Sequence, residues 1–316
     1  MALLVIGSVA FDAIETPFGK TDKIIGGAAT FISLAASYFT KPVNLVGVVG
    51  GDFSRSDIEL MQKHGVNTEG LQIKENERSF FWSGKYSNDM NTRETLVTEL
   101  NVLENFDPII PDSYQDCDFL MLGNLLPQIQ KTVIQRLNKR PKLIVLDTMN
   151  FWMDTALNDL LETISMVDVL SINDEEARQL SNEYSLVKAA KKILKTVKAG
   201  SRDPAFTKTG PKVLIIKKGE HGALLFNENQ VFFAPALLLE DVFDPTGAGD
   251  SFAGGFIGYL ASTNDISFQN MKRAIIYGSA MASFCVEKFG TERLVGLSKE
   301  DLYKRVRQFT DLVKID

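Results

Sequence analysis

The residues best suited to chemistry lie at 244–256, which read Asp-Pro-Thr-Gly-Ala-Gly-Asp-Ser-Phe-Ala-Gly-Gly-Phe. The small residues Gly247, Ala248 and Gly249 allow a tight turn, and Asp250 then opens an amphipathic helix rich in Ala and Gly. Such a turn gathers free N–H groups and the positive end of a helix dipole, which together can hold an anion. A carboxylate there can accept a proton from a substrate hydroxyl while the turn holds a moving phosphoryl group.

The same segment also allows a purely structural interpretation. Gly-x-Gly turns before helices are common, and Asp is a favoured residue at a helix N-cap. The chain lacks the Gly-x-x-x-x-Gly-Lys-Ser/Thr pattern of a P-loop, and this segment is not the Gly-x-Gly-x-x-Gly fingerprint that follows a first strand. Taken alone, the segment leaves a catalytic turn and a structural turn both open.

The elements that must position this turn form a repeating pattern. Short apolar runs rich in β-branched residues predict strands at 3–7, 43–49, 119–122, 143–147, 167–172 and 213–217. Helical patterns lie at 28–38, 55–64, 131–138, 174–181, 186–197, 250–261 and 268–286. Near-continuous apolar strands are typical of a parallel sheet covered on both faces. The alternation favours an α/β fold with a doubly wound, mostly parallel central sheet flanked by helices.

Two regions break this pattern. Residues 69–103 alternate apolar and polar side chains, which predicts antiparallel strands with one face in water. We expect a small antiparallel β lid from this region, joined by residues 12–25. Trp82 in this stretch either covers a substrate or packs the lid onto the main domain. Residues 199–211 are rich in Gly, Ser, Lys, Thr and Pro and predict a surface loop.

Composition and charge exclude several classes of protein. The 316 residues are 45% hydrophobic and 23% charged, which suits a single globular domain over residues 1–316 with a lid. The net charge is −6 without a Lys/Arg block, so no nucleic-acid partner is expected. No apolar run approaches the ~20 residues that span a membrane. The apolar run at 3–7 lacks a basic flank and predicts a strand, not a signal peptide.

Cysteine and histidine are scarce. The two cysteines, Cys117 and Cys285, are too few for a disulfide framework and fit a reducing cytoplasm. The two histidines, His64 and His221, are far apart, which disfavours a histidine metal site or a Ser-His-Asp site. An acidic chain can still bind ATP, because a nucleotide site needs only local positive potential.

The motif at 244–252 resembles the C-terminal signature of the ribokinase-like (PfkB-type) carbohydrate kinases. In that family the last Asp of the motif is the catalytic base, and the Gly-Ala-Gly backbone forms the anion hole. The resemblance implies these roles for Asp250 and for Gly247, Ala248 and Gly249. It also implies that the doubly wound sheet has the ribokinase-like fold.

Further segments match the family's motifs in order, from about residue 3 to residue 294. Gly26 and Gly27 resemble the N-terminal Gly-Gly substrate motif, and Asp12 stands where the family holds substrate hydroxyls. The family usually carries Asn a few residues after Gly-Gly, but Phe31 stands there, and a ring cannot replace an amide that bonds a hydroxyl. Asn124 stands where several relatives carry an acid. We expect these residues at the acceptor site, and rank a sugar or sugar derivative above a flatter nucleoside.

Two more matches concern the nucleotide. Asn173 and Glu176 resemble the Asn-x-x-Glu motif, which implies that they orient Mg²⁺ through its waters. They would also form a capping box, and the two roles are compatible. The family has a turn at the end of a strand that runs beside the nucleotide, and Lys217, Gly219 and Gly222 resemble that turn. The glycines alone also suit a hairpin.

The resemblance extends to the segments that border the adenine. It implies nucleotide contacts for Thr246 in the C-terminal motif, for Ser279 and Ser283 on a helix rich in small residues, and for Gly290 after that helix. Some relatives bind a monovalent cation such as K⁺ through the loop that holds Asp244. The sequence leaves that cation open.

Together these matches imply a kinase that uses ATP and Mg²⁺ to phosphorylate a small molecule in the cytoplasm. In the expected in-line transfer, Asp250 accepts the hydroxyl proton while the amides of Ala248, Gly249 and Asp250 stabilise the transferring group. The alternatives are a nucleoside kinase on the same fold, a non-catalytic nucleotide- or sugar-binding protein, and a scaffold. Exposed lid edges also predict a homodimer that pairs through the lid.

Overall fold

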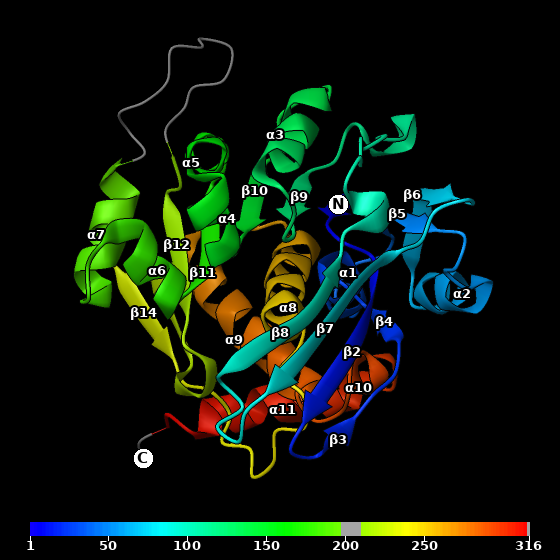
Figure 1. Ribbon diagram of the computed structural model, residues 1–316. Coiled ribbons are helices and arrows are strands. Elements are labelled where there is room, and N and C mark those ends of the chain that lie inside the picture. Colours follow the sequence, from blue (N-terminus) through cyan, green and yellow to red (C-terminus); the bar gives the residue numbers. More distant parts are fainter. Residues whose placement is uncertain (197–209, 315–316) are drawn as a thin grey trace.

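The computed structural model describes residues 1–196 and 210–314. Its main sheet contains β1 (Leu3–Ile6), β5 (Val43–Gly50), β6 (Val66–Lys74), β9 (Phe119–Leu122), β10 (Leu143–Asp147), β11 (Val169–Asn173), β12 (Val213–Lys217), β13 (Ala223–Phe226) and β14 (Val231–Ala234) (Figure 1). The strand order is β14-β13-β12-β11-β10-β9-β1-β5-β6. In this order, each pair of adjacent strands between β12 and β6 is parallel. Strands β13 and β14 pair antiparallel at the β12 edge of the sheet. The expected mostly parallel sheet is confirmed.

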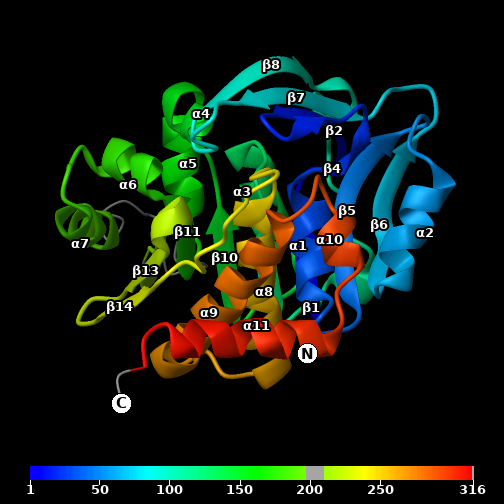
Figure 2. The same cartoon turned by 90° about the horizontal axis from the view of Figure 1, so that it is seen from below.

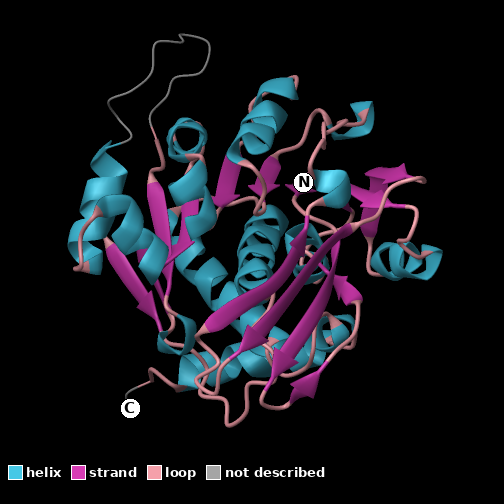
Figure 3. Ribbon diagram, viewed as in Figure 1, coloured by secondary structure: helices cyan, strands magenta, loops and turns pink. Residues whose placement is uncertain are grey.

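Helices cover both faces of the sheet, as Figures 2 and 3 show. One face is covered by α1 (Ala28–Ala36), α8 (Ala248–Thr263) and α9 (Phe268–Cys285), and the other by α3 (Pro127–Arg136), α5 (Leu157–Ile164), α6 (Asp174–Ser181) and α7 (Leu186–Thr196). In β1, Leu3 and Val5 pack on the first group, whereas Leu4 and Ile6 pack on the second. Every residue of β1 is therefore buried, which explains why such strands are continuously apolar.

The remaining helices lie around this core. Helix α2 (Arg55–Lys63) packs against the edge strand β6, and α4 (Asn150–Thr155) contacts α5 and α6. Helices α10 (Glu292–Val295) and α11 (Lys299–Asp311) pack against α9. Helix α9 is therefore packed against α10 and α11 as well as against α8, and its contact with α8 is extensive.

A second sheet forms the lid, which Figure 2 shows as a separate layer at the top of the view. It contains β2 (Ala10–Thr16), β3 (Gly19–Lys20), β4 (Ile24–Gly26), β7 (Phe80–Tyr86) and β8 (Arg93–Glu99). Strands β3 and β4 pair antiparallel with β2, and β8 pairs antiparallel with β7. The two chain segments of the lid meet where β2 and β7 run parallel.

The expected lid boundary at residue 69 needs a correction. Residues 69–74 belong to β6, which pairs in parallel with β5 at the edge of the main sheet. An edge strand has one face partly open to solvent, so β6 mixes buried and exposed residues and lacks the continuous burial of the central strands. Periodicity alone could not separate the two sheets.

The structure also bears on the expected element bounds, the surface loop, the cysteines and the membrane-spanning segments. Strands β9, β10 and β12 and helix α6 have the bounds that the sequence predicts. Most of the expected loop at 199–211 lies outside the described residues. Cys117 and Cys285 are buried free thiols. Within the described ranges, no helix has the length and apolar character that crossing a bilayer would require.

Candidate active site

Three neighbouring parallel strands end in residues that can do chemistry. Strands β10, β11 and β12 end in Asp147, Asn173 and Lys217, and Asn173 and Lys217 are direct partners in the sheet register. Parallel neighbours present their carboxyl ends at one edge of the sheet, where α/β proteins bind ligands. Sequence reasoning named Asn173 and Lys217 but missed Asp147, although an acid at the last position of a predicted strand was the available signal.

Lys217 and Asp147 form a buried ion pair. The Lys217 Nζ lies 2.8 Å from Asp147 Oδ2, and the two side chains are only 17% and 6% exposed. The other oxygen, Asp147 Oδ1, accepts a hydrogen bond from the Thr148 backbone N–H. Burial alone would lower the pKa of the Lys217 ammonium, but the charges of Asp147, Glu176 and Asp250 outweigh it and raise that pKa. Lys217 is therefore a fixed positive charge at this edge.

The predicted turn lies beside this pair. Helix α8 begins after Gly247, whose φ of 76° and ψ of 0° favour glycine. Burial raises the pKa of Asp250 to about 7, with a further increase from the negative charge of Asp147 and a decrease from Lys217. A carboxyl group with that pKa is suited to accept a proton near neutral pH.

The backbone of the turn offers N–H groups to an anion. Ser251 N–H donates to the Gly247 carbonyl, and Ala248 N–H donates to the Pro245 carbonyl at 3.2 Å. Within the described part of the chain, no hydrogen bond uses the N–H of Gly249 or Asp250. The expected anion hole is therefore open at Gly249 and Asp250, whereas the N–H of Ala248 already has a partner in the turn.

Asp12 and the Gly26-Gly27 pair, which the sequence predicts at the acceptor site, lie side by side in the lid. A Cβ atom on Gly26 would lie 1.9 Å from Asp12 Oδ2, so a side chain at position 26 would displace this carboxyl group. Burial raises the pKa of Asp12 to about 7; the Gly27 N–H bond and the charge of Arg93 oppose this, while Asp244 and Asp250 add to it. Asp250 is therefore near enough for its charge to act on the Asp12 carboxyl group, and a shared role at the acceptor site stays a prediction.

Phe31 requires a correction. It is only 1% exposed, and a Cβ atom on Gly247 would lie 2.5 Å from the atoms of its ring. The ring therefore packs beneath the turn and does not line the acceptor pocket. The reason is its position on α1, whose residues are all buried. The sequence motif gives the position of Phe31 along the chain, but it does not show which way the side chain points.

Asn124 also has structural partners. Its Nδ2 donates to Met149 Sδ at 3.0 Å, and its Oδ1 accepts from Trp152 Nε1 at 2.8 Å. The amide thus ties the start of α4 to the end of β9. Contact of Asn124 with a substrate stays a prediction.

Asn173 and Glu176 form the expected capping box at the start of α6. Asn173 Oδ1 accepts from the Glu176 N–H, and Glu176 Oε2 accepts from the Asn173 N–H, both at 2.8 Å. Burial raises the pKa of Glu176 to about 7, while the charge of Lys217 opposes the increase. Among the described residues, no group of three or more His, Cys, Asp and Glu side chains is arranged to hold a metal ion directly. A Mg²⁺ contact through water stays a prediction.

The turn after β12 approaches the tip of the lid. Gly219 and Gly222 have φ values of 53° and 83°, and the Lys218 N–H donates to the Gly222 carbonyl. A Cβ atom on Gly219 would lie 3.4 Å from Oδ1 of Asn91, which belongs to the β7–β8 hairpin. The expected nucleotide turn and the lid are therefore neighbours.

Asp244 links two loops. Its carboxylate is fully buried, and its two oxygens accept hydrogen bonds from the N–H groups of Thr246 and Gly290, each at 2.8 Å. Burial raises its pKa, although these hydrogen bonds oppose the increase. The carboxylate thus fastens the loop before α8 to the loop after α9. Cation binding by Asp244 stays a prediction.

Ser279 and Ser283 lie on α9 and are nearly buried, at 9% and 8% exposure. The Ser283 hydroxyl donates to the Ala280 carbonyl and accepts from Arg305 of α11 at 2.9 Å. Ser283 therefore has a structural role between α9 and α11. Nucleotide contacts of both serines stay predictions.

The lid contributes residues that the sequence did not single out. Tyr86 accepts a hydrogen bond from the Thr246 hydroxyl at 3.1 Å. Arg93 carries its guanidinium 5.1 Å from the centre of the Trp82 ring, and its charge acts on both Asp12 and Tyr86. Trp82 packs against Gly84 within the lid, so its contacts are those of lid packing.

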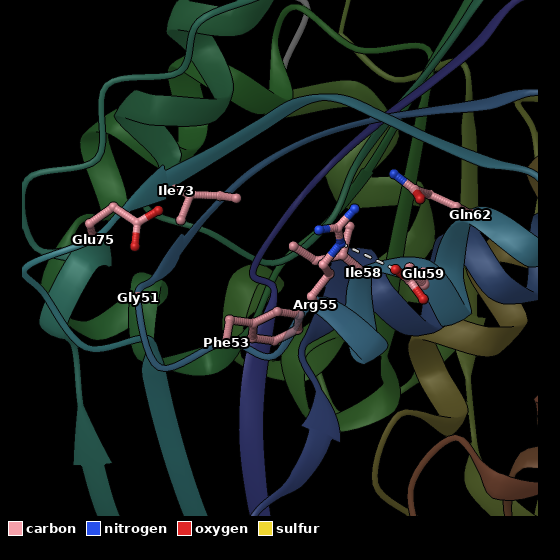
Figure 4. A pocket seen from close by; sticks show the side chains of 8 residues that line it. All are labelled: Gly51, Phe53, Arg55, Ile58, Glu59, Gln62, Ile73 and Glu75. Atoms are coloured by element: carbon pink, nitrogen blue, oxygen red, sulfur yellow. Dashed lines mark ion pairs between the residues drawn. The ribbon is translucent and has the colours of Figure 1, made fainter.

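A separate hollow lies at another edge of the molecule (Figure 4). It has a volume of about 380 Å³ and is lined by Gly51, Phe53, Arg55, Ile58, Glu59, Gln62, Ile73 and Glu75. These residues come from α2, from β6 and the residue after it, and from the segment after β5, and none of them belongs to the expected site. Two of the lining residues, Arg55 and Glu59, form an exposed ion pair.

Known proteins resemble this chain over most of its length. It is 29% identical to a cytidine kinase of Thermococcus kodakarensis over 81% of this chain and 87% of that protein. It is 24% identical to a nucleoside kinase of Methanothermobacter thermautotrophicus over 98% and 95% of the two chains. The solved structure of a Methanocaldococcus jannaschii nucleoside kinase, 20% identical, superposes with a TM-score of 0.74 over 98% of this chain and 99% of that one.

A family model, described as pfkB family carbohydrate kinase, matches residues 2–295. That range includes both sheets, the Asp12 region, the strand ends at Asp147, Asn173 and Lys217, and the turn before Asp250. The chain therefore belongs to the pfkB family of carbohydrate kinases, and it is a phosphotransferase that acts on an alcohol group.

Proposed function

We propose that this chain transfers the γ-phosphoryl group of ATP to a hydroxyl group of a nucleoside, with Asp250 as the general base. The observation that carries the proposal is the turn at the start of α8. There the Asp250 carboxyl group, whose pKa is raised to about 7, adjoins the backbone N–H groups of Gly249 and Asp250. Neither N–H group donates a hydrogen bond to any of the described residues. Proton removal and stabilisation of an anionic group are thereby supplied by adjacent residues.

The choice of a nucleoside rests on the relatives. A cytidine kinase and several nucleoside kinases are among the proteins that match most of this chain, although a ribokinase of Lactococcus lactis also matches over 91% of it. The sequence alone ranks a sugar first, whereas the names of these relatives favour a nucleoside. Asp12, supported by Gly26 and Gly27, would hold hydroxyl groups of the ribose, which a nucleoside and a free sugar both present.

The nucleotide would lie along the carboxyl ends of β11 and β12. Asn173 and Glu176 suit Mg²⁺ bound through water, because their capping box fixes both side chains and uses only one oxygen of the Glu176 carboxylate. When bound, Mg²⁺ would supply neutralisation of phosphate charge. The turn at Gly219 and Gly222 would run beside the nucleotide. The lid would exclude water from the closed site.

The lid also supports the proposal of a homodimer. All seven residues of β8 are exposed, and in the described residues β8 pairs only with β7. Leu96 and Val97 on this strand are 46% and 40% exposed. An edge strand of this kind can pair with the same strand of a second copy.

The proposed function is tested by a screen for ATP consumption. The purified protein is incubated with MgATP and single nucleosides, free sugars or sugar acids, and ADP formation is coupled to a spectroscopic readout. A nucleoside should give a kcat/KM at least ~10-fold above that of free ribose, a difference that a few extra contacts can supply. Turnover with sugars alone would assign the second candidate, a sugar kinase.

A further inference from the structure

The ammonium group of Lys217 lies beside the proposed anion hole. A Cβ atom placed on Gly249 would be 3.1 Å from Lys217 Nζ, so this nitrogen borders the backbone that should receive the phosphoryl group. The same Nζ is held by Asp147 Oδ2 at 2.8 Å. The pair spans β11, because Asp147 ends β10 and Lys217 ends β12.

The surroundings of Lys217 carry more negative than positive charge. Asp147, Glu176 and Asp250 all act on this single ammonium group. An ammonium group has three N–H donors, and the hydrogen bonds of the described residues use one of them, toward Asp147. The remaining donors lie at a site where N–H groups of Gly249 and Asp250 are also unused. Unused backbone and side-chain donors therefore lie close to one another.

We propose that Lys217 is a catalytic residue that donates hydrogen bonds to the transferring phosphoryl group, and that Asp147 is the positioning residue that holds it there. This rests on the proposed function, in which the α8 turn receives the phosphoryl group. The bond from the acceptor oxygen to phosphorus forms while the bond from phosphorus to the bridging oxygen of ADP breaks. The hydroxyl proton passes to Asp250, and Lys217 keeps its protons throughout.

A purely structural ion pair makes a different prediction. If Lys217 served only to join the ends of β10 and β12, its replacement would lower stability and affect all ligands alike. A donor to the transferring group acts mainly in the transition state, so its loss lowers kcat and leaves the KM for MgATP nearly unchanged. The control residue is Lys218, the next lysine in the chain. Its Nζ lies 5.8 Å from the ring centre of Phe233.

The first experiment measures thermal shifts with MgADP and with MgADP plus aluminium fluoride, which mimics the transferring group. The variants are Lys217→Met, Lys217→Arg and Lys218→Met. We expect all proteins to be stabilised by MgADP. We expect the extra stabilisation by aluminium fluoride to disappear in Lys217→Met, to return in part in Lys217→Arg, and to stay intact in Lys218→Met. An unchanged extra shift in Lys217→Met, or no extra shift in the wild type, overturns the proposal.

Kinetics with the best acceptor from the screen give the second readout. Lys217→Met should lose about 10²- to 10³-fold in kcat, the usual effect of removing one donor from an anion hole. Asp147→Asn, which keeps the shape but loses the charge, should lose about 10-fold in kcat with a KM for MgATP within about threefold of wild type. Equal effects on kcat and on MgADP binding would assign both residues a structural role.

Removal of Lys217 alone leaves Asp147 buried without its partner, which can prevent folding. The double variant Lys217→Met/Asp147→Leu removes both charges together and serves as the folded substitute. It should bind MgADP and still lack the extra shift with aluminium fluoride. Asp250→Asn separates the two proposals, because it should keep that shift while losing turnover. An active Asp250→Asn enzyme would contradict the assignment of the base without affecting that of Lys217.

Discussion

The hydroxyl group of Tyr86 on the lid accepts a hydrogen bond of 3.1 Å from Thr246, four residues before Asp250. This contact joins the lid directly to the loop that leads into the Gly247 turn at the start of α8. The Asn91 tip of the same hairpin lies against the nucleotide turn at Gly219. The lid therefore contacts both the turn that would bind phosphate and the turn that would pass the nucleotide.

Tyr86→Phe should weaken closure of the lid. Loss of one hydrogen bond of about 1 kcal/mol corresponds to about a fivefold change in the closed population. We expect acceptor-independent ATP hydrolysis to rise about fivefold, because water enters an open site more often. Phosphate release without acceptor measures this directly. The control is Tyr184→Phe, since Tyr184 is 94% exposed and belongs to no part of the site. Equal hydrolysis by both variants would argue against a closing role for Tyr86.

Asp250→Asn should abolish most turnover while preserving nucleotide binding. An amide cannot accept the hydroxyl proton, and general-base effects are typically about 10²- to 10⁴-fold in kcat. Initial rates with saturating MgATP and acceptor measure the loss, and the thermal shift with MgADP checks binding. Asp112→Asn, at an exposed site in the 3-10 turn Asp112–Tyr114, is the control. Near-normal turnover of Asp250→Asn would mean that another group accepts the proton.

The pH dependence of the reaction should follow the same group. Because the pKa of Asp250 is raised to about 7, its base form accumulates as pH rises, and kcat/KM should increase through about pH 7. Asp12 also has a pKa near 7, so an Asp12→Asn enzyme should keep the inflection if Asp250 causes it. A flat profile across this range would contradict the assignment.

The same raised pKa affects stability in the opposite direction. A carboxyl group that holds its proton more tightly when folded contributes stability that is fully present below its ordinary unfolded pKa of 3.8 and is lost as pH rises through about 7. The wild-type Tm should therefore fall relative to that of Asp250→Asn between about pH 5 and about pH 8. Thermal unfolding of both proteins across this range measures the difference. A constant difference would mean that burial does not shift this group.

The sequence predicted the elements whose signal is local. Strands β9, β10 and β12 are continuous apolar runs because helices cover both faces of the sheet, and α6 is marked by the Asn173–Glu176 capping box. The turn before Asp250 was also recognisable, since the positive φ of Gly247 requires a residue without a side chain. In each case the signal lies within a few consecutive residues.

What the sequence could not predict depends on contacts between distant segments. Asp147 and Lys217 are 70 residues apart, and they meet only because β10 and β12 flank β11 in the sheet. The parallel pairing of β2 with β7 likewise has no local signal. Phe31 was misjudged because the motif gives its position along α1 but not the burial of its ring beneath Gly247.

Phe31→Ala should reduce both stability and kcat. Removal of a fully buried ring typically costs about 3–5 kcal/mol, and the cavity would lie directly under Gly247. We expect kcat to fall more than the KM for the acceptor changes, because the ring supports the turn and does not contact substrate. Phe309→Ala, in the same apolar cluster, is the matched control that should lose stability but keep kcat. A change confined to the acceptor KM would restore Phe31 to the substrate pocket.

Leu96→Lys on β8 should weaken the proposed lid dimer. Leu96 is 46% exposed on an edge strand, and a charged residue there opposes pairing between two copies of the strand. We expect the dimer dissociation constant to rise at least about 10-fold, which corresponds to about 1.4 kcal/mol. Sedimentation velocity over a range of protein concentrations measures it. Leu157→Lys, a similarly exposed leucine on α5, should leave the assembly unchanged. A wild-type protein that stays monomeric at every concentration would refute the dimer, and equal dissociation in both variants would move the interface away from β8.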